Sequence, residues 1–193
     1  MSGPFGSSQL MYASGAEAFT IDQSLRFDSA TNAYLSKTFA GAGNRKTWTW
    51  SAWVKQGDID GYLFFAYSGN SDSDFGGIEL SSGTGKLKFN SYHSNACESE
   101  AIFRDHSAWY HLMCVMDTTQ AVEGNRIKLY VNGELLTKTI GSSHPSQNDD
   151  MSINAATEHN ISSRNAHSSS HYFDGYMAEV HFIDGTALTP TSF

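Results

Sequence analysis

The chain has 193 residues, of which 12 are basic and 20 acidic, and its net charge is −8. Seventeen glycines against three prolines predict many tight turns, and 13% aromatic residues are too many for a disordered chain. An acidic chain lacks the basic footprint of proteins that bind nucleic acids or anionic lipids, so neither partner is expected. No stretch approaches the ~20 apolar residues that a membrane helix needs.

Two cysteines bear on the redox compartment. Cys114 lies in an apolar run and is expected to be a small core residue, whereas Cys97 lies in a polar stretch. A disulfide between them is the less favoured alternative. We expect a chain that is made in a reducing cytoplasm and folds without bridges.

Residues 1–20 predict an extended arm that precedes a folded domain of residues 21–193. The segment is rich in Gly, Ser and Ala, has no Lys or Arg, and shows no strand periodicity. It has too little apolar area to fold alone, because ordering each residue costs ~1–2 kcal/mol. One reading is a terminus without a docking role. The other is an arm that docks on a partner through four large apolar anchors: Phe5, Leu10, Met11 and Tyr12.

From Ile21 onward the hydrophobic pattern has a period of two, which is the signal of β-strands. Strands are expected at 24–27, 34–38, 48–55, 62–67, 77–80, 86–92, 110–117, 126–132 and 175–182, with one more near 151–155. In the closing strand, Tyr176, Ala178, Val180 and Phe182 are expected to share one face. The residues expected to face the core are Trp48, Trp50, Ile127, Leu129, Val131, Val180 and Phe182.

Glycine-rich turns separate these strands, and Asn132-Gly133 is typical of a type I′ hairpin turn, in which both residues adopt positive φ. Short alternating strands need a second sheet to cover their apolar faces. The sequence therefore predicts an all-β fold, an antiparallel β-sandwich of two sheets.

Five motifs in order carry a resemblance to a known family. They are Ser24–Phe27 with Ala33–Leu35, Trp48–Lys55, Trp109–Met113, Ile127–Gly133, and Phe173–Val180 followed by Ala187–Pro190. Together they resemble the concanavalin A-like lectin/glucanase family, in its laminin G-like or pentraxin-like branch. The resemblance implies a jelly-roll sandwich in which the strand at 176–183 pairs with the strand at 25–27.

The segment from Gly43 to Ser51 resembles modules of tailed-bacteriophage virion proteins, which include tail fibres, appendages and capsid-surface proteins. The resemblance implies a non-enzymatic structural protein on the virion surface that displays a lectin-like module for host adhesion. Its expected partners are other virion proteins, further copies of the chain and a host-surface glycan. The alternatives are a soluble glycan-binding lectin and a glycoside hydrolase with an unrecognised motif.

Catalysis is not expected, because Glu98-Ser99-Glu100 alternates as a glucanase carboxylate pair would but lacks the third acid and the flanking aromatic residues. Lectin sites combine an aromatic face with amide and carboxylate groups. Tyrosines near polar loops are the candidates for such a site: Tyr62, Tyr67, Tyr92 and Tyr172.

No cofactor is expected, with Ca²⁺ as the one candidate metal, because acidic loops can supply the several oxygen ligands that it needs. The candidate ligands are Asp72, Asp74, Asp149 and Asp150, and the alternative is that these loops are solvated turns. Zinc at His167 and His171 is improbable, because the three serines between them disfavour a helix.

Overall fold

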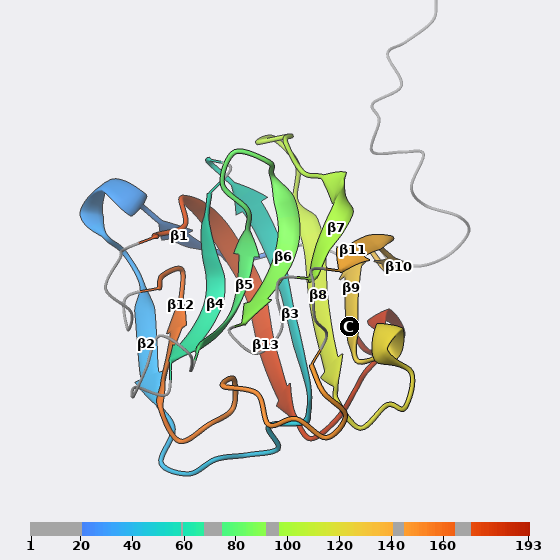
Figure 1. The fold of residues 1–193 in the computed structure, drawn as a ribbon. Coiled ribbons are helices and arrows are strands. Elements are labelled where there is room, and N and C mark those ends of the chain that lie inside the picture. Colours follow the sequence, from blue (N-terminus) through green and yellow to red (C-terminus); the bar gives the residue numbers. More distant parts are fainter. Residues whose placement is uncertain (1–20, 59, 68–74, 92–96, 141–144, 165–170) are drawn as a thin grey trace, which may run out of the picture.

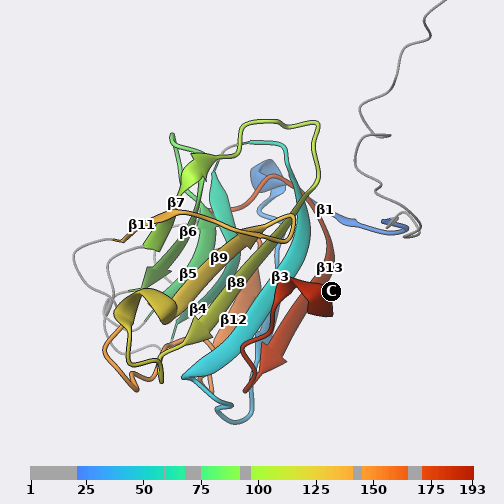
Figure 2. The same ribbon diagram turned by 90° about the vertical axis from the view of Figure 1, so that its right-hand side faces the viewer.

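The computed structural model describes residues 21–58, 60–67, 75–91, 97–140, 145–164 and 171–193. These residues form a sandwich of two antiparallel sheets, shown from two directions in Figures 1 and 2. The six-stranded sheet has the order β1-β13-β3-β8-β9-β10, and the seven-stranded sheet has the order β11-β7-β6-β5-β4-β12-β2. The predicted all-β sandwich is confirmed.

The strands of the six-stranded sheet are β1 (Leu25–Phe27), β3 (Thr47–Gln56), β8 (Tyr110–Asp117), β9 (Ile127–Val131), β10 (Glu134–Leu135) and β13 (Gly175–Asp184). Those of the seven-stranded sheet are β2 (Leu35–Thr38), β4 (Gly61–Tyr67), β5 (Phe75–Leu80), β6 (Lys86–Ser91), β7 (Cys97–Ile102), β11 (Lys138–Ile140) and β12 (Glu158–Ile161). The described part of the chain also has three short 3-10 helices, at Ser29–Thr31, Glu123–Asn125 and Pro190–Ser192. Among the described residues, no helix is long and apolar enough to span a membrane.

The core lies between the two sheets and follows the predicted alternation. Trp48, Trp50, Ile127 and Leu129 are buried in it, as expected. The other three residues of the predicted set are only partly buried and pack against the cluster: Val131, Val180 and Phe182. Cys97 and Cys114 are both free and buried. Burial raises the pKa of Cys97 to about 11 and raises that of Cys114 as well, so both thiols stay protonated at neutral pH.

The closing strand β13 departs from the prediction. Its pairing with β3 is interrupted by a β-bulge between Ala178 and His181, and Glu179 in the bulge has φ of +47°. The bulge shifts the alternation by one residue. Met177, which precedes the bulge, and Phe182, which follows it, therefore both face the core. Tyr176 therefore lies on the opposite face from Phe182, and the expectation that the two share a face was wrong.

Two further expectations needed correction. Residues 151–155 are buried but form turns, and the strand expected there is β12, which begins at Glu158. Strand β7 was not expected, because Cys97–Ile102 is too polar to show a hydrophobic alternation. It lies between β11 and β6, and its Glu98 and Glu100 point away from the core. The hairpin turn at Asn132-Gly133 has φ of 48° and 85°, which confirms the type I′ prediction.

The first and last strands lie side by side, as the family resemblance implied. Leu25 pairs with Met177 and Phe27 pairs with Gly175. The chain after β13 folds back over the outer face of the six-stranded sheet, where the Thr49 hydroxyl donates to the Thr186 carbonyl and accepts from the Leu188 amide. The predicted arm of residues 1–20, with its four anchors, lies outside the described residues.

Candidate functional site

Polar side chains gather in a hollow on the outer surface of the seven-stranded sheet, at the end where β4 begins. The hollow consists of two adjoining pockets of about 240 and 300 Å³ that share Asp60 and His171. We call it the polar depression. The first pocket is lined by Asp60, Tyr62, Glu79, Ser81, Ser82, Lys88, Asn90, Arg164 and His171, and the second by Ser29, Asn32, Asp58, Asp60, His171, Tyr172 and Asp174.

A register shift in β4 sets up the floor of the depression. Between Tyr62 and Phe64 the pairing with β5 slips, so Leu63 and Phe64 both enter the core. Tyr62 and Phe65 instead lie on the outer face, where their rings meet edge to face with centroids 5.1 Å apart. Both rings lie over Gly77 of β5, and a Cβ there would come within 2.5 Å of Tyr62 Cε1. Only glycine leaves room for this arrangement.

Three neighbouring strands supply the polar groups of the first pocket. Glu79 on β5 pairs in register with Tyr62 on one side and Lys88 of β6 on the other. Its carboxylate lies 3.1 Å from the Lys88 ammonium, and Asn90 Nδ2 donates to the Tyr62 hydroxyl over 3.4 Å. Burial and the nearby Glu79 charge raise the pKa of Tyr62 well above its usual range, so the phenol stays neutral.

Arg164, which follows β12, covers the aromatic floor. Its guanidinium carbon lies 5.7 Å from the centroid of the Tyr62 ring and 5.4 Å from that of Phe75, within the range of cation–π contacts. Tyr62 is only 2% exposed as a result. With Gly77 beneath the ring and Arg164 over it, Tyr62 does not offer a stacking face.

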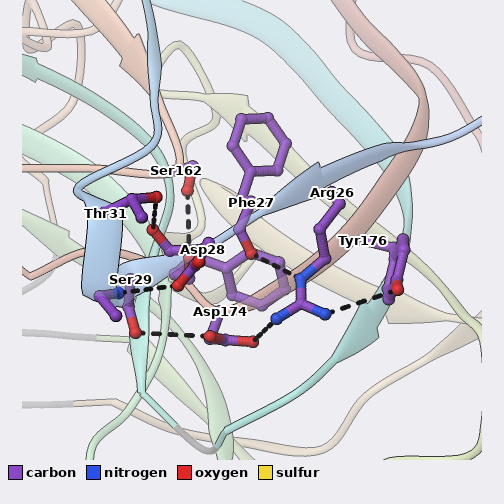
Figure 3. A network of polar contacts seen from close by, with 10 residues as sticks. Arg26, Phe27, Asp28, Ser29, Thr31, Ser162, Asp174 and Tyr176 are labelled. Atoms are coloured by element: carbon purple, nitrogen blue, oxygen red, sulfur yellow. Dashed lines mark hydrogen bonds and ion pairs between the residues drawn. The ribbon is translucent and has the colours of Figure 1, made fainter.

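A hydrogen-bonded network holds the rim of the second pocket (Figure 3). Asp174, just before β13, accepts from Arg26 Nη2 at 3.2 Å and from the Ser29 hydroxyl at 3.5 Å. The Asp28 carboxylate accepts from the Ala30 amide and so caps the helical turn that carries Ser29. These contacts join β1 and the helical turn after it to the segment just before β13, and they fix the position of the Asp174 carboxylate.

The structure brings two of the four predicted tyrosines together. Tyr62 and Tyr172 form an isolated parallel bridge, and the Tyr172 ring lies 6.1 Å from that of Tyr34. Tyr172 is half-buried and lines the second pocket beside its polar groups. Tyr67 lies at the far end of β4, and Tyr92 lies outside the described residues.

The predicted calcium ligands do not gather in the described part of the chain. Asp72 and Asp74 lie outside the described residues. Asp149 and Asp150 lie in the loop before Met151, where the Asp150 carboxylate is 4.0 Å from Lys46 Nζ. Over the described ranges, no three His, Cys, Asp or Glu side chains form a group that could hold a metal ion.

Several residues of the polar depression were not singled out from the sequence: Glu79, Lys88, Asn90, Arg164, Asp60 and Asp174. A weak signal exists for three of them, because Glu79, Lys88 and Asn90 alternate with buried residues and so must face outward. Their convergence depends on the order of β4, β5 and β6 in the sheet. Arg164 and Asp174 come from connections whose path the strand pattern does not define.

The chemistry of the depression is that of a surface which binds hydroxyl groups. The first pocket contains two basic groups, Lys88 and Arg164, and two acidic groups, Asp60 and Glu79, so its formal charges balance when His171 is neutral. The carboxylates accept hydrogen bonds, while the lysine and the Asn90 amide donate them. Such a mixture suits a ligand with many hydroxyls, each able to donate and to accept.

The family model for the concanavalin A-like lectin/glucanases superfamily matches residues 27–192. No curated protein sequence matches the chain. Among solved structures, domains LG4-5 of the mouse laminin alpha1 chain superpose with a TM-score of 0.62 and 11% identity, over 91% of this chain and 45% of that one. The chain thus spans about half of that laminin fragment.

Two other solved structures are similar. The CBM40 domain of the Ruminococcus gnavus IT-sialidase, bound to alpha2,3 sialyllactose, has a TM-score of 0.52 and 13% identity, over 82% of this chain and 95% of that one. The enzymatically active domain of bacteriophage CBA120 tailspike protein 2 has a TM-score of 0.55 and 14% identity, over 83% of this chain and 25% of that one. At such identities the likenesses show a shared fold. The family match covers most of the chain, which therefore belongs to the concanavalin A-like lectin/glucanases superfamily.

Proposed function

We propose that this protein is a non-catalytic glycan-binding module carried on the surface of a bacteriophage virion, where it contacts host-surface sugars. The observation that carries the proposal is the polar depression, in which hydrogen-bonding groups from three strands and four connections surround one hollow. Sugar sites of lectins need such convergent donors and acceptors next to an aromatic edge or face.

The arrangement favours a neutral or zwitterionic sugar. Of the four carboxylates in the depression, Glu79 is held by Lys88 and Asp174 by Arg26, so these two do not offer an isolated charge. Tyr172 lies beside these groups and can contact the apolar face of a pyranose. The related CBM40 structure contains a sialyllactose, which supports sugar binding as a use of this fold.

Absence of catalysis is part of the proposal. Of the two alternating carboxylates in β7, Glu98 forms an ion pair with Lys86 at 3.0 Å. A retaining glycosidase needs two carboxyl groups that face the substrate at ~5 Å from each other, free to act as acid and nucleophile. An ion-paired Glu98 does not suit either role.

The virion location rests on the resemblance of Gly43–Ser51 to phage modules, and the fold shared with a phage tailspike domain supports it. As a structural protein of a fibre, an appendage or the capsid surface, the chain would contact other virion proteins or further copies of itself. A gel of purified particles tests this location, because the chain must be present in stoichiometric amounts. Its absence from particles would leave the soluble lectin as the better assignment.

A glycan array tests the binding activity. We expect the purified chain to bind a restricted set of glycans, because its hydrogen-bonding groups have fixed positions. A reducing-sugar assay on the bound glycans distinguishes the hydrolase alternative, and we expect no release of sugar. An array without any bound glycan would contradict the proposed function, whereas sugar release would contradict its non-catalytic part.

A further inference from the structure

An apolar groove runs along one side of the sandwich. Its lining differs in chemical character from that of the polar depression. It consists of two pockets of about 330 and 410 Å³ that share Leu35, Ile161 and Val180. The remaining apolar lining comes from both sheets: Leu25, Phe27, Phe39, Trp50, Phe64, Met177, Ala178 and Phe182. Trp50 and Phe64 belong to the core, so the groove reaches the interior between the sheets.

Two strand edges border this groove. On one side, β2 is the last strand of the seven-stranded sheet, and all four of its residues are exposed. On the other, β13 pairs with β1 only from Gly175 to Met177, so in the described part of the chain its edge from Ala178 to Asp184 has no strand neighbour on that side. Unpaired edges beside an apolar surface are the usual acceptors of an added extended segment.

We infer that the groove binds the N-terminal arm, residues 1–20, of a second copy of this chain. The arm has the right chemistry, because its only charged side chain is Glu17 and its large apolar residues include the four predicted anchors: Phe5, Leu10, Met11 and Tyr12. Few charged groups line the groove, namely Lys37, Glu179 and, when protonated, His159. In an extended segment Leu10 and Tyr12 point to the same side and can enter the groove together.

The direction in which the chain leaves the fold favours a second copy over the same molecule. Gln23, Ser24 and Leu25 line one end of the groove, so the described chain that follows the arm lies beside it. In Figure 2, however, the blue segment before β1 leads away from both sheets. We infer from the direction of the described residues that the arm reaches a neighbour, and that a neighbour with the same geometry returns its own arm. Such reciprocal exchange closes a twofold dimer.

The inference does not depend on glycan binding and is tested on the full chain without sugar. Light scattering coupled to size exclusion should show twice the 21.1 kDa chain mass. Leu35→Glu places a charge on the exposed rim of the groove and should yield monomers that remain folded. Leu135→Glu is the matched control, because Leu135 is a similarly exposed leucine on β10, away from the groove, and should leave the dimer intact.

Cysteine pairing identifies which arm occupies the groove. We expect a chain with Tyr12→Cys, mixed with one carrying Leu35→Cys, to form a disulfide-linked pair on a non-reducing gel. The native cysteines are buried and do not interfere. If Leu35→Glu does not fold, Leu10→Ser with Tyr12→Ser removes the anchors outside the described fold and should also give monomers. A monomeric wild-type chain, a dimer that survives the groove or arm variants, or a disulfide only within a doubly substituted chain would each overturn the inference.

Discussion

At the scale of single residues, Trp50 shows how much one side chain contributes to the core. It is fully buried between the sheets, opposite Cys114 and Phe182 in the register of β3. Truncation to alanine should lower the free energy of unfolding by ~3–5 kcal/mol, as is usual for a large buried aromatic residue. Trp53→Ala is the control, because Trp53 lies on the outer face against His111 and should cost much less. Equal losses in a urea titration would mean that the faces of β3 are assigned wrongly.

His159 gives the fold a dependence on pH. Its Nε2 accepts from the Asn154 amide at 2.9 Å, and its Nδ1 donates to the Thr157 carbonyl, so the neutral ring is the form that fits. Burial lowers the pKa of His159 below the ~6.5 of an unfolded histidine. The unfolded chain therefore binds more protons below pH ~6.5, and stability is lost as the pH falls through the folded-state value.

Denaturant titrations between pH 8 and pH 5 measure this effect. We expect the free energy of unfolding to fall over this range, and His159→Gln to reduce the fall. His111, whose pKa burial also lowers and whose Nε2 lies 2.7 Å from the Ser51 hydroxyl, should contribute a second part. A variant with both histidines replaced and the same pH dependence as the wild type would show that carboxylates cause the loss.

At the scale of strands, Gly77 decides whether β4 and β5 can support the polar depression. A Cβ at Gly77 would come within 2.5 Å of Tyr62 and 2.9 Å of Phe65, so Gly77→Ala must displace these rings. Overpacking of this kind costs ~1–3 kcal/mol. Gly124→Ala is a matched control, because a Cβ there meets no atom within 4 Å. Similar melting temperatures for the two variants would contradict the described floor of the site.

Strand positions were largely predictable, because alternation in β3, β8 and β9 reflects burial of one face of each strand. The bulge in β13 was not, since Glu179 with a positive φ leaves no mark in a hydrophobic pattern. A shift of one residue moves every later side chain to the other face, which is why Tyr176 was misassigned. The register shift in β4 has the same origin and explains why Tyr62 lies on the outer face while Leu63 and Phe64 are in the core.

At the scale of the whole molecule, the candidate site depends on topology more than on any motif. Tyr62 and Tyr172 were predicted from their polar surroundings, and they lie together because the chain returns to β4 more than a hundred residues later. Glu79, Lys88 and Asn90 come from strands whose neighbours are set by the sheet order. Composition and alternation define the sandwich, but they contain no information on which loops meet at its rim.

The sandwich also separates its two proposed contacts in space. The polar depression lies on the outer surface of the seven-stranded sheet, around β4, β5 and β6, while the apolar groove lies between β2 and β13 at the edges of the two sheets. A module built in this way can assemble through one surface and keep the other available. Variants in the groove should therefore leave sugar affinity unchanged, which titration of monomeric Leu35→Glu checks.

Calorimetric titration of the strongest array glycan into the wild-type chain and into Lys88→Met tests the central claim most directly. Lys88 lies in the polar depression beside Glu79, and its loss removes a donor and leaves that carboxylate unpaired. We expect affinity to fall about tenfold, the effect of ~1.4 kcal/mol. Lys128→Met, on β9 of the other sheet, should bind like the wild type. Equal affinities for Lys88→Met and the wild type would contradict the assignment of the polar depression as the glycan site.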